Sequence, residues 1–420
     1  MMNETNRIFI RNASQVVTCS GVEARKGKAM SDLRIIEDGA VAISEGVITH
    51  VGTTEDILTQ IKQGEYHVVD AKGKALLPGF IDSHTHLVFG GYREEEFSWR
   101  LHGDSYMSIM ERGGGIANTM KATRNANDQE LMESSRCRLD DMLAMGVTTV
   151  EGKSGYGLDK DTELAQLRIM KRLNREHPVD IIPTFLGAHA IPPEYKDRTD
   201  DYLDYIIYNV LPDVRKERLA VFCDIFCEKG VFSVEQSERL LRTAEKQYGL
   251  RPKLHADEIV SLGGTELAVK LNAVSADHLL QASDEGIRRL AQSNTIATLL
   301  PLTAFSLNEP YARGREMIDA GCAVALASDL NPGSCFSCSI PMLFALSCIK
   351  MKLTPEEAVT ALTINAAAAV GQAETICSID IGKKADVLLL RFPSYKFLPY
   401  HIGMNIVETV IKNGKIVVDG

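Results

Sequence analysis

The sequence has no apolar run long enough to cross a membrane, and its N-terminus has no basic segment followed by an apolar run. A membrane-spanning helix needs about 20 mostly apolar residues, and a secretory signal needs both of the N-terminal features. We therefore expect neither a membrane span nor a signal peptide.

Positive charge is also scarce. The net charge of −10 at pH 7 argues against nucleic acid and anionic membranes as partners, because both bind basic faces. A small anionic substrate remains compatible, since it needs only one local arginine. The nine cysteines are odd in number and scattered, which favours a reducing cytoplasm over a disulfide framework.

The 420 residues are too many for one ordinary domain. Residues 1–77 contain β-rich runs broken by Gly, Asn and Asp, and residues 376–420 contain similar runs with Asn413-Gly414 as a hairpin turn. We predict that these two segments form one small β-sandwich domain. Residues 78–375 would form a separate, larger domain between them.

The central segment alternates short apolar runs with amphipathic segments of helical length, such as 161–178 and 233–249. Eight runs are predicted as strands: Gly79–His86, Thr148–Gly152, Ile181–Gly187, Val221–Cys227, Pro252–His255, Ala273–His278, Thr295–Pro301 and Ala323–Asp329. Eight strands alternating with helices predict a (β/α)₈ barrel in the α/β class. A doubly wound open sheet is the alternative, but no glycine-rich dinucleotide-binding motif follows the first run.

Histidine gathers at the ends of these predicted strands, where barrel enzymes carry their chemistry. His84 and His86 end the first strand, and residues two apart in a strand point to the same face. His255 ends the fifth strand and Asp329 the eighth. Three imidazoles and a carboxylate would make a site for one divalent metal ion, zinc or iron.

Two further residues at strand ends are candidates for hydrolytic chemistry. A metal ion lowers the pKa of a bound water to about 7, and hydrolysis then needs a group that moves protons. Glu258, three residues after His255, could do so, and Asp329 could also take a proton from the attacking water. His278 could donate to the developing oxyanion. The ordinary alternatives are a helix N-terminal carboxylate for Glu258 and a buried filler for His278.

The segments "PGFIDSHTHL", "HADE", "SADH" and "SDLNPG", in this order, resemble the amidohydrolase superfamily of metal-dependent barrel hydrolases, over essentially the whole chain. The segments "FGGYREEEF", "ERGGGIANTM", "EGKSGYGLD", "FLGAHAIPPEY" and "SDLNPGS" resemble more closely the imidazolonepropionase family within it. This resemblance implies a hydrolase of histidine degradation that opens 4-imidazolone-5-propanoate to N-formimidoyl-L-glutamate. It also implies a homodimer.

The resemblance implies roles at matching positions. His84, His86, His255 and Asp329 would hold the metal, Glu258 would contact the substrate and handle protons, and His278 would polarise the ring carbonyl. The remaining substrate contacts would come from Arg93, Tyr156, His189, Asn331, Gly333 and Ser334. Arg93 would pair with the propionate, although three glutamates follow it and a surface salt bridge is its ordinary alternative. The turn containing Asn331 has an ordinary Pro-Gly turn as its alternative.

Some features limit this interpretation. The predicted fourth strand has no lysine, and Lys229 follows it too late, so we expect one metal rather than the two held by many superfamily members through a carboxylated lysine. Cys335 and Cys338 are predicted to be buried thiols rather than a zinc pair. Glycines 113–115 could form an active-site loop.

The alternative functions are a cytosine-type heterocycle deaminase of the same superfamily and a non-catalytic barrel scaffold.

Overall fold

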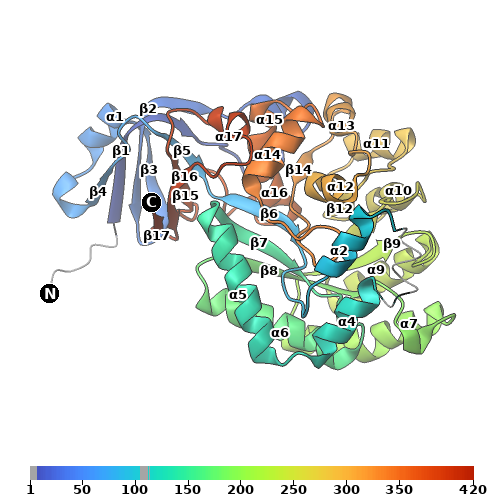
Figure 1. Ribbon diagram of the computed structural model, residues 1–420. Helices are drawn as coiled ribbons and strands as arrows, with labels where there is room; N and C mark the ends of the chain where they lie inside the picture. Colours follow the sequence, from blue (N-terminus) through green and yellow to red (C-terminus); the bar gives the residue numbers. More distant parts are fainter. Residues whose placement is uncertain (1–6, 105–111, 113) are drawn as a thin grey trace.

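The computed structural model describes residues 7–104, 112 and 114–420, and Gly113 of the predicted glycine loop therefore lies outside the described residues. A β-sheet built from both ends of the chain stands beside a barrel ringed by helices (Figure 1). The α/β class and this combination of a barrel with a small β domain confirm the predicted fold class. No described helix is long and apolar enough to span a bilayer.

The small sheet joins the two chain termini. Its strands are β1 (Arg7–Val17), β2 (Ile35–Ser44), β3 (Val47–Thr53), β4 (His67–Asp70), β5 (Ala75–Pro78), β15 (Val387–Leu390), β16 (Val407–Lys412) and β17 (Lys415–Asp419). They run in the order β17-β16-β15-β5-β1-β2-β3, with β4 paired to β1. The two ends of the chain meet where β15 pairs antiparallel with β5. This sheet corresponds to the predicted β-sandwich domain, whose exact boundaries at residues 77 and 376 stay a prediction.

The hairpin between β16 and β17 turns at Asn413 and Gly414, as the sequence indicates. Their φ angles are 49° and 71°. Two positive φ angles in succession are typical of the type I′ turn that matches the twist of a β-hairpin.

The central domain is a parallel barrel. Its strands are β6 (Phe80–Thr85), β7 (Val147–Lys153), β8 (Asp180–Ala188), β9 (Phe222–Cys227), β11 (Leu254–Ala256) with the short β10 (Arg251–Pro252) before it, β12 (Ser275–His278), β13 (Ile296–Leu299) and β14 (Val324–Leu326). Each of the eight predicted runs overlaps one of these barrel strands. The barrel closes just beyond β14, where Asp329 N donates to His84 O at 3.0 Å and His86 N donates to Leu330 O at 2.9 Å.

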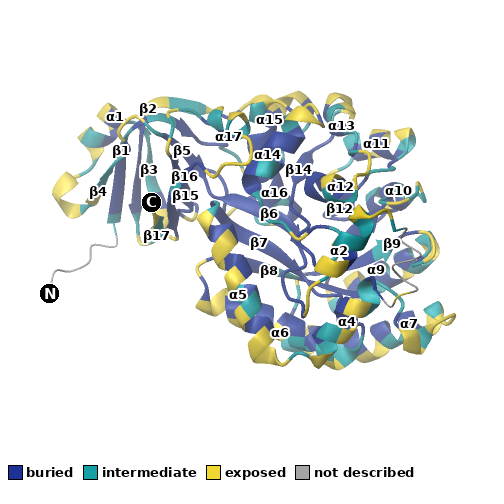
Figure 2. Cartoon of the chain, viewed as in Figure 1, coloured by how far each residue is buried: buried dark blue, intermediate teal, exposed yellow. Residues whose placement is uncertain are grey.

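Helices surround the barrel and bury their apolar faces against the strands (Figure 2). The two segments predicted as helices are α6 (Lys160–Glu176) and α9 (Val234–Tyr248). Asp159 and Ser233 accept hydrogen bonds from the first turns of α6 and α9, which explains where these helices begin. The longer helices among the rest are α2 (Glu94–Leu101), α4 (Ile116–Asn125), α5 (Asp128–Ala144), α11 (Asp284–Ala291), α14 (Ile340–Ile349) and α15 (Pro355–Leu362). The shorter ones are α1 (Thr54–Gln60), α7 (Thr199–Tyr205), α8 (Leu211–Glu217), α10 (Gly264–Lys270), α12 (Pro301–Leu307), α13 (Gly314–Ala320), α16 (Ile364–Ala369) and α17 (Phe397–Tyr400).

Candidate active site

Four side chains proposed from the sequence as metal ligands meet at the carboxyl end of the barrel strands. His84 on β6 and His86 directly after it lie with their Nε2 atoms 3.5 and 3.6 Å from Asp329 Oδ1. The ring of His255, from β11, lies 4.6 Å from the ring of His84 and 5.5 Å from that of His86. All four side chains are buried. Strand alternation thus places both imidazoles of the His-x-His pair on the inner face.

The chemistry of this cluster fits a metal ion. Ligand atoms within 4.8 Å of one another form three overlapping groups: His84, His86 and Asp329; His84, His255 and His278; and His86, His189 and His255. Within the described residues, His84 Nε2, His255 Nε2 and Asp329 Oδ1 are buried and have no hydrogen-bond partner. A buried polar atom without a partner is costly, and a cation among these atoms would satisfy them. Nitrogen and oxygen ligands of this kind suit zinc or iron.

An unusual backbone conformation brings Asp329 and His278 into the site. The φ angle is 54° at Asp329 and 77° at His278, in the left-handed region that residues other than glycine rarely adopt. Consecutive strand residues normally face opposite sides, yet Asp277 contacts the His84 ring while the His278 ring lies only 5.3 Å from it. Such conformations need support from the surrounding fold, and they gather at functional sites.

Glu258 lies beside His278. Its Oε2 is 3.5 Å from His278 Nδ1, and its side chain is 16% exposed. Burial, together with the charges of Asp329 and Glu228, raises the pKa of Glu258 to about 8. Burial lowers the pKa of His278 to about 4, so that its imidazole is neutral at pH 7 and has one N–H to donate. Glu258 can therefore change its protonation state close to neutral pH.

Tyr156 and His189 form a neighbouring wall. The His189 ring stacks on His86 with centroids 4.9 Å apart, and the Tyr156 ring lies 5.2 Å from His189. His189 Nδ1 donates to the Gly155 carbonyl oxygen at 3.0 Å, since a carbonyl only accepts. His189 Nε2 is then the acceptor nitrogen of this ring. The position beside the cluster is compatible with substrate contact, which stays a prediction.

Arg93 lies in the segment after β6, immediately before α2. Its Nε donates to Glu96 Oε2 at 2.8 Å, and its side chain is 15% exposed. Glu96 also accepts from Gly115 N at 3.0 Å. The outer end of the guanidinium packs against Gly333, where an added Cβ would lie 2.5 Å from Arg93 Cζ. Arg93 thus does pair with one of the three following glutamates, but its Nη atoms lie against the turn predicted to contact substrate.

The side chain of Asn331 organises that turn. Its Oδ1 accepts from Gly333 N at 2.9 Å and Ser334 N at 2.8 Å, and its Nδ2 donates to Asp329 O at 2.8 Å. These bonds are typical of an Asx turn. They fix Gly333 and Ser334 next to Asp329, and the direct substrate contact proposed for Asn331 stays a prediction.

Sequence reasoning missed several buried polar residues under the cluster. Asp277 Oδ2 accepts from His84 Nδ1 at 2.7 Å, and Asp329 Oδ2 accepts from Thr303 Oγ1 at 2.7 Å. Asp224 Oδ2 lies 3.0 Å from His255 Nδ1. A signal was present, because charged residues stand inside otherwise apolar runs such as "VFCDIFC" and "VSADH".

Comparison with known proteins identifies the family. A profile of the amidohydrolase family matches residues 67–126 and 116–418. The imidazolonepropionase of Parabacteroides distasonis is 67% identical over 413 residues, which cover 98% of this chain and 99% of that protein. The imidazolonepropionase of Clostridium tetani is 60% identical over 410 residues, 98% of each chain.

The chain belongs to the imidazolonepropionase family of amidohydrolases. Solved structures share its fold at much lower identity. A mutant atrazine chlorohydrolase from Arthrobacter aurescens, complexed with zinc and atraton, superposes with a TM-score of 0.73 at 17% identity, covering 98% of this chain and 95% of that one. Guanine deaminase of E. coli superposes with a TM-score of 0.71 at 16% identity, covering 99% of each chain.

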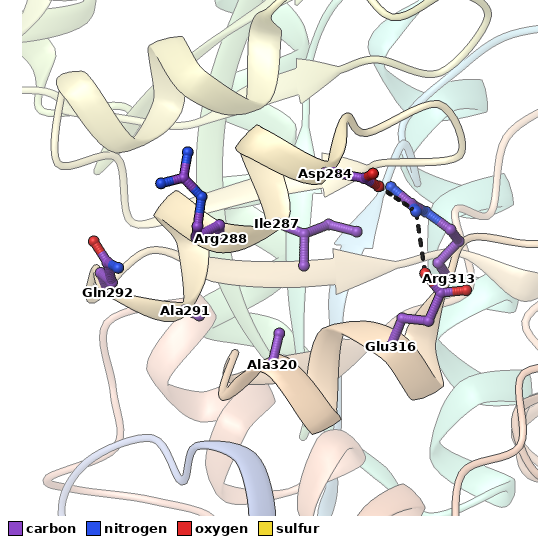
Figure 3. A pocket seen from close by; sticks show the side chains of 8 residues that line it. All are labelled: Asp284, Ile287, Arg288, Ala291, Gln292, Arg313, Glu316 and Ala320. Atoms are coloured by element: carbon purple, nitrogen blue, oxygen red, sulfur yellow. Dashed lines mark hydrogen bonds and ion pairs between the residues drawn. The ribbon is translucent and has the colours of Figure 1, made fainter.

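A hollow on the outer ring of helices differs from this site in its chemistry. It lies between α11 and α13 (Figure 3). Its Arg313 is 2.7 Å from Asp284 and 3.1 Å from Glu316, so that the cation is already paired. None of the histidines of the cluster lines it, and we assign it no role in catalysis.

Proposed function

We propose that this chain hydrolyses the cyclic amide C–N bond of 4-imidazolone-5-propanoate and releases N-formimidoyl-L-glutamate. The observation that carries the proposal is the 57–67% identity, over 98% of the chain, to relatives named imidazolonepropionase. The arrangement of the candidate site supports it, because a basic side chain for a carboxylate lies near a cluster suited to a metal.

In this proposal His84, His86, His255 and Asp329 hold one zinc or iron ion. When bound, the ion supplies a water that is nucleophilic at neutral pH. The fit rests on the buried, unpartnered nitrogen and oxygen atoms described above. The zinc named in the chlorohydrolase structure belongs to that protein.

The residues around the cluster bind and orient the substrate. Arg93 binds the propionate, and its planar guanidinium offers two donors to a carboxylate. This contact holds the ring carbonyl at a fixed place beside Glu258 and His278. Tyr156 and His189 pack against the ring, and Gly333 and Ser334 present backbone and hydroxyl groups to the glutamate portion.

His278 and Glu258 act on the reacting atoms. His278 is neutral at pH 7 and donates its proton as a hydrogen bond to the carbonyl oxygen as negative charge develops there. The water oxygen forms a bond to the carbonyl carbon, and Glu258 moves a proton from the water to the departing ring nitrogen. The C–N bond breaks, the ring opens and the proton count balances, with one water consumed.

The test is a direct assay of the purified, metal-loaded protein with 4-imidazolone-5-propanoate and, separately, with cytosine. We expect turnover of the imidazolone only, because cytosine has no carboxylate for Arg93 to bind. Turnover of cytosine alone would favour a deaminase, and absence of both activities in a protein with a full complement of metal would favour a scaffold.

Two other proposals concern the state of the enzyme in the cell. We place it in the cytoplasm, because its nine cysteines are free thiols and suit a reducing compartment. We propose a homodimer on the family resemblance, to be tested by light scattering.

A further inference from the structure

A network of buried charges lies directly beneath the histidine cluster. It consists of Glu151 and Lys153 on β7, Asp224 on β9, Lys253 just before β11, and Asp277 on β12. Each of the five side chains is 0% exposed. Taking charged groups out of water is expensive, and apolar residues of similar volume would often be at least as stable. Stability alone is therefore a weak reason for placing three carboxylates and two ammonium groups inside the barrel.

Lys153 is the centre of this network. Its Nζ lies 2.7 Å from Asp224 Oδ2, 2.9 Å from Glu151 Oε1 and 3.3 Å from Asp277 Oδ2. Lys253 pairs with Glu151 as well. One ammonium group thus contacts carboxylates from three strands, which fixes the positions of Asp224 and Asp277 relative to each other.

Asp224 and Asp277 also contact histidines of the cluster. Asp277 Oδ2 accepts from His84 Nδ1 at 2.7 Å, and Asp277 Oδ1 accepts from Ser275 Oγ at 2.5 Å. Asp224 Oδ1 accepts from His255 N at 3.1 Å, and Asp224 Oδ2 lies 3.0 Å from His255 Nδ1 without a hydrogen bond to it. An imidazole that donates from Nδ1 to a carboxylate presents the lone pair of Nε2 on its opposite edge. In His84 that Nε2 is the atom 3.5 Å from Asp329 Oδ1.

We propose that Asp277, held in place by Lys153, is a positioning residue that fixes the proton and the ring orientation of His84 for metal binding, and that Asp224, held by the same lysine, positions His255 through its backbone N–H. The inference rests on the metal site of the proposed function but not on its substrate. Carboxylates behind ligating histidines commonly set ligand orientation and basicity, and their removal typically costs about 10–100-fold in metal affinity.

The experiment measures zinc affinity by competition with a chromophoric chelator, using the full chain. Asp277→Asn keeps an acceptor for His84 but loses the charge, and we expect about 10-fold weaker zinc binding. Asp277→Ala also loses the acceptor, and we expect up to about 100-fold. In the cobalt-substituted protein, the visible d–d absorption of Asp277→Ala should shift, because the His84 ring is no longer held.

Asp386→Asn provides the matched control. Asp386 is buried in the small domain and lies 2.6 Å from Lys412 Nζ, so that this change also removes one buried carboxylate from an ion pair. We expect a lower midpoint of thermal unfolding with unchanged zinc affinity. Equal losses of zinc affinity in Asp386→Asn and Asp277→Asn would overturn the proposal, because the effect would then follow from general destabilisation.

The remaining outcomes also test the proposal. Zinc affinity of folded Asp277→Ala within twofold of the unsubstituted protein refutes a positioning role, and if this variant does not fold, the same criterion applies to Asp277→Asn. Absence of zinc binding by the unsubstituted protein overturns the inference as well. Tight zinc binding without turnover of 4-imidazolone-5-propanoate would overturn only the proposed activity.

Discussion

Replacing Gly333 by alanine tests how closely the turn after β14 fits Arg93. The added Cβ would lie 2.5 Å from Arg93 Cζ and 2.9 Å from Nη2, and closer still to Nη1. The φ angle of Gly333 lies outside the left-handed region, so that alanine is compatible with the backbone. The clash is with the end of a flexible side chain, and we expect the protein to fold and the guanidinium to move.

The size of the movement sets the expected effect. Non-bonded carbon atoms are most stable about 3.5–4.0 Å apart, so a distance of 2.5 Å requires the guanidinium to withdraw by roughly 1 Å. A misplacement of about 1 Å can cost on the order of 100-fold, and a hydrogen bond to a charged group contributes about 1.5–3 kcal/mol. We therefore expect Gly333→Ala to lower kcat/KM for 4-imidazolone-5-propanoate by about 10–100-fold. The loss should appear in kcat as well as in KM, because in the proposed mechanism the carboxylate contact also holds the ring carbonyl in place.

The assay combines steady-state kinetics with metal content and thermal unfolding. Gly64→Ala is the control, since a Cβ at this position in the small domain meets no atom within 4 Å. We expect wild-type kinetics for Gly64→Ala, and unchanged metal content in both variants. On an Arg93→Met background, Gly333→Ala should have little further effect, because the displaced group is already absent. A wild-type kcat/KM for Gly333→Ala, or an equal loss on the Arg93→Met background, would refute the reasoning.

Further predictions concern Glu258 and His86. Glu258→Gln should retain its metal by elemental analysis but lose about 10²–10⁴-fold in kcat, and full activity would remove Glu258 from proton transfer. His86→Ala should lose both metal and activity, and a full complement of metal would exclude His86 as a ligand. In the metal-free protein, the pKa of Glu258 is raised from 4.5 to about 8. The side chain therefore binds a proton more tightly in the folded protein than in the unfolded chain. Its contribution to stability should decline as pH rises from about 4.5 to about 8. After the metal is removed with a chelator, urea unfolding should show that the free energy of unfolding of Glu258→Gln declines less steeply with pH than that of the unsubstituted protein, by up to about 1.4 kcal/mol per pH unit. Identical slopes for the two proteins would argue against the raised pKa.

The barrel could be predicted because its signals are local. Each strand lies in an apolar run of a few residues, and several helices show their own periodicity and a capping residue, such as Asp159 and Ser233. His84 and His86 were visible as candidates because alternation along one strand sets both on one face without reference to the rest of the chain.

The charged network could not be predicted in the same way. Glu151, Lys153, Asp224 and Asp277 come from three strands separated by intervening helices, and each of them alone is a charge interrupting an apolar run. A single apolar run does not indicate whether its charged side chain faces the barrel axis, or with which oppositely charged side chain it pairs there. The inward turn of His278, with its φ angle of 77°, is equally invisible, because alternation alone would set it opposite to Asp277.

The sequence by itself determined the order of strands and helices, the hairpin at Asn413 and Gly414, and the kinds of side chain available for chemistry, because these depend on neighbours in the chain. Tertiary structure decided which atoms meet. Closure of the barrel through His84 and Asp329 sets their side chains 3.5 Å apart, although 244 residues separate them in the sequence. The physical reason is that backbone pairing across the barrel seam fixes these positions, whereas local propensity acts only over a few residues.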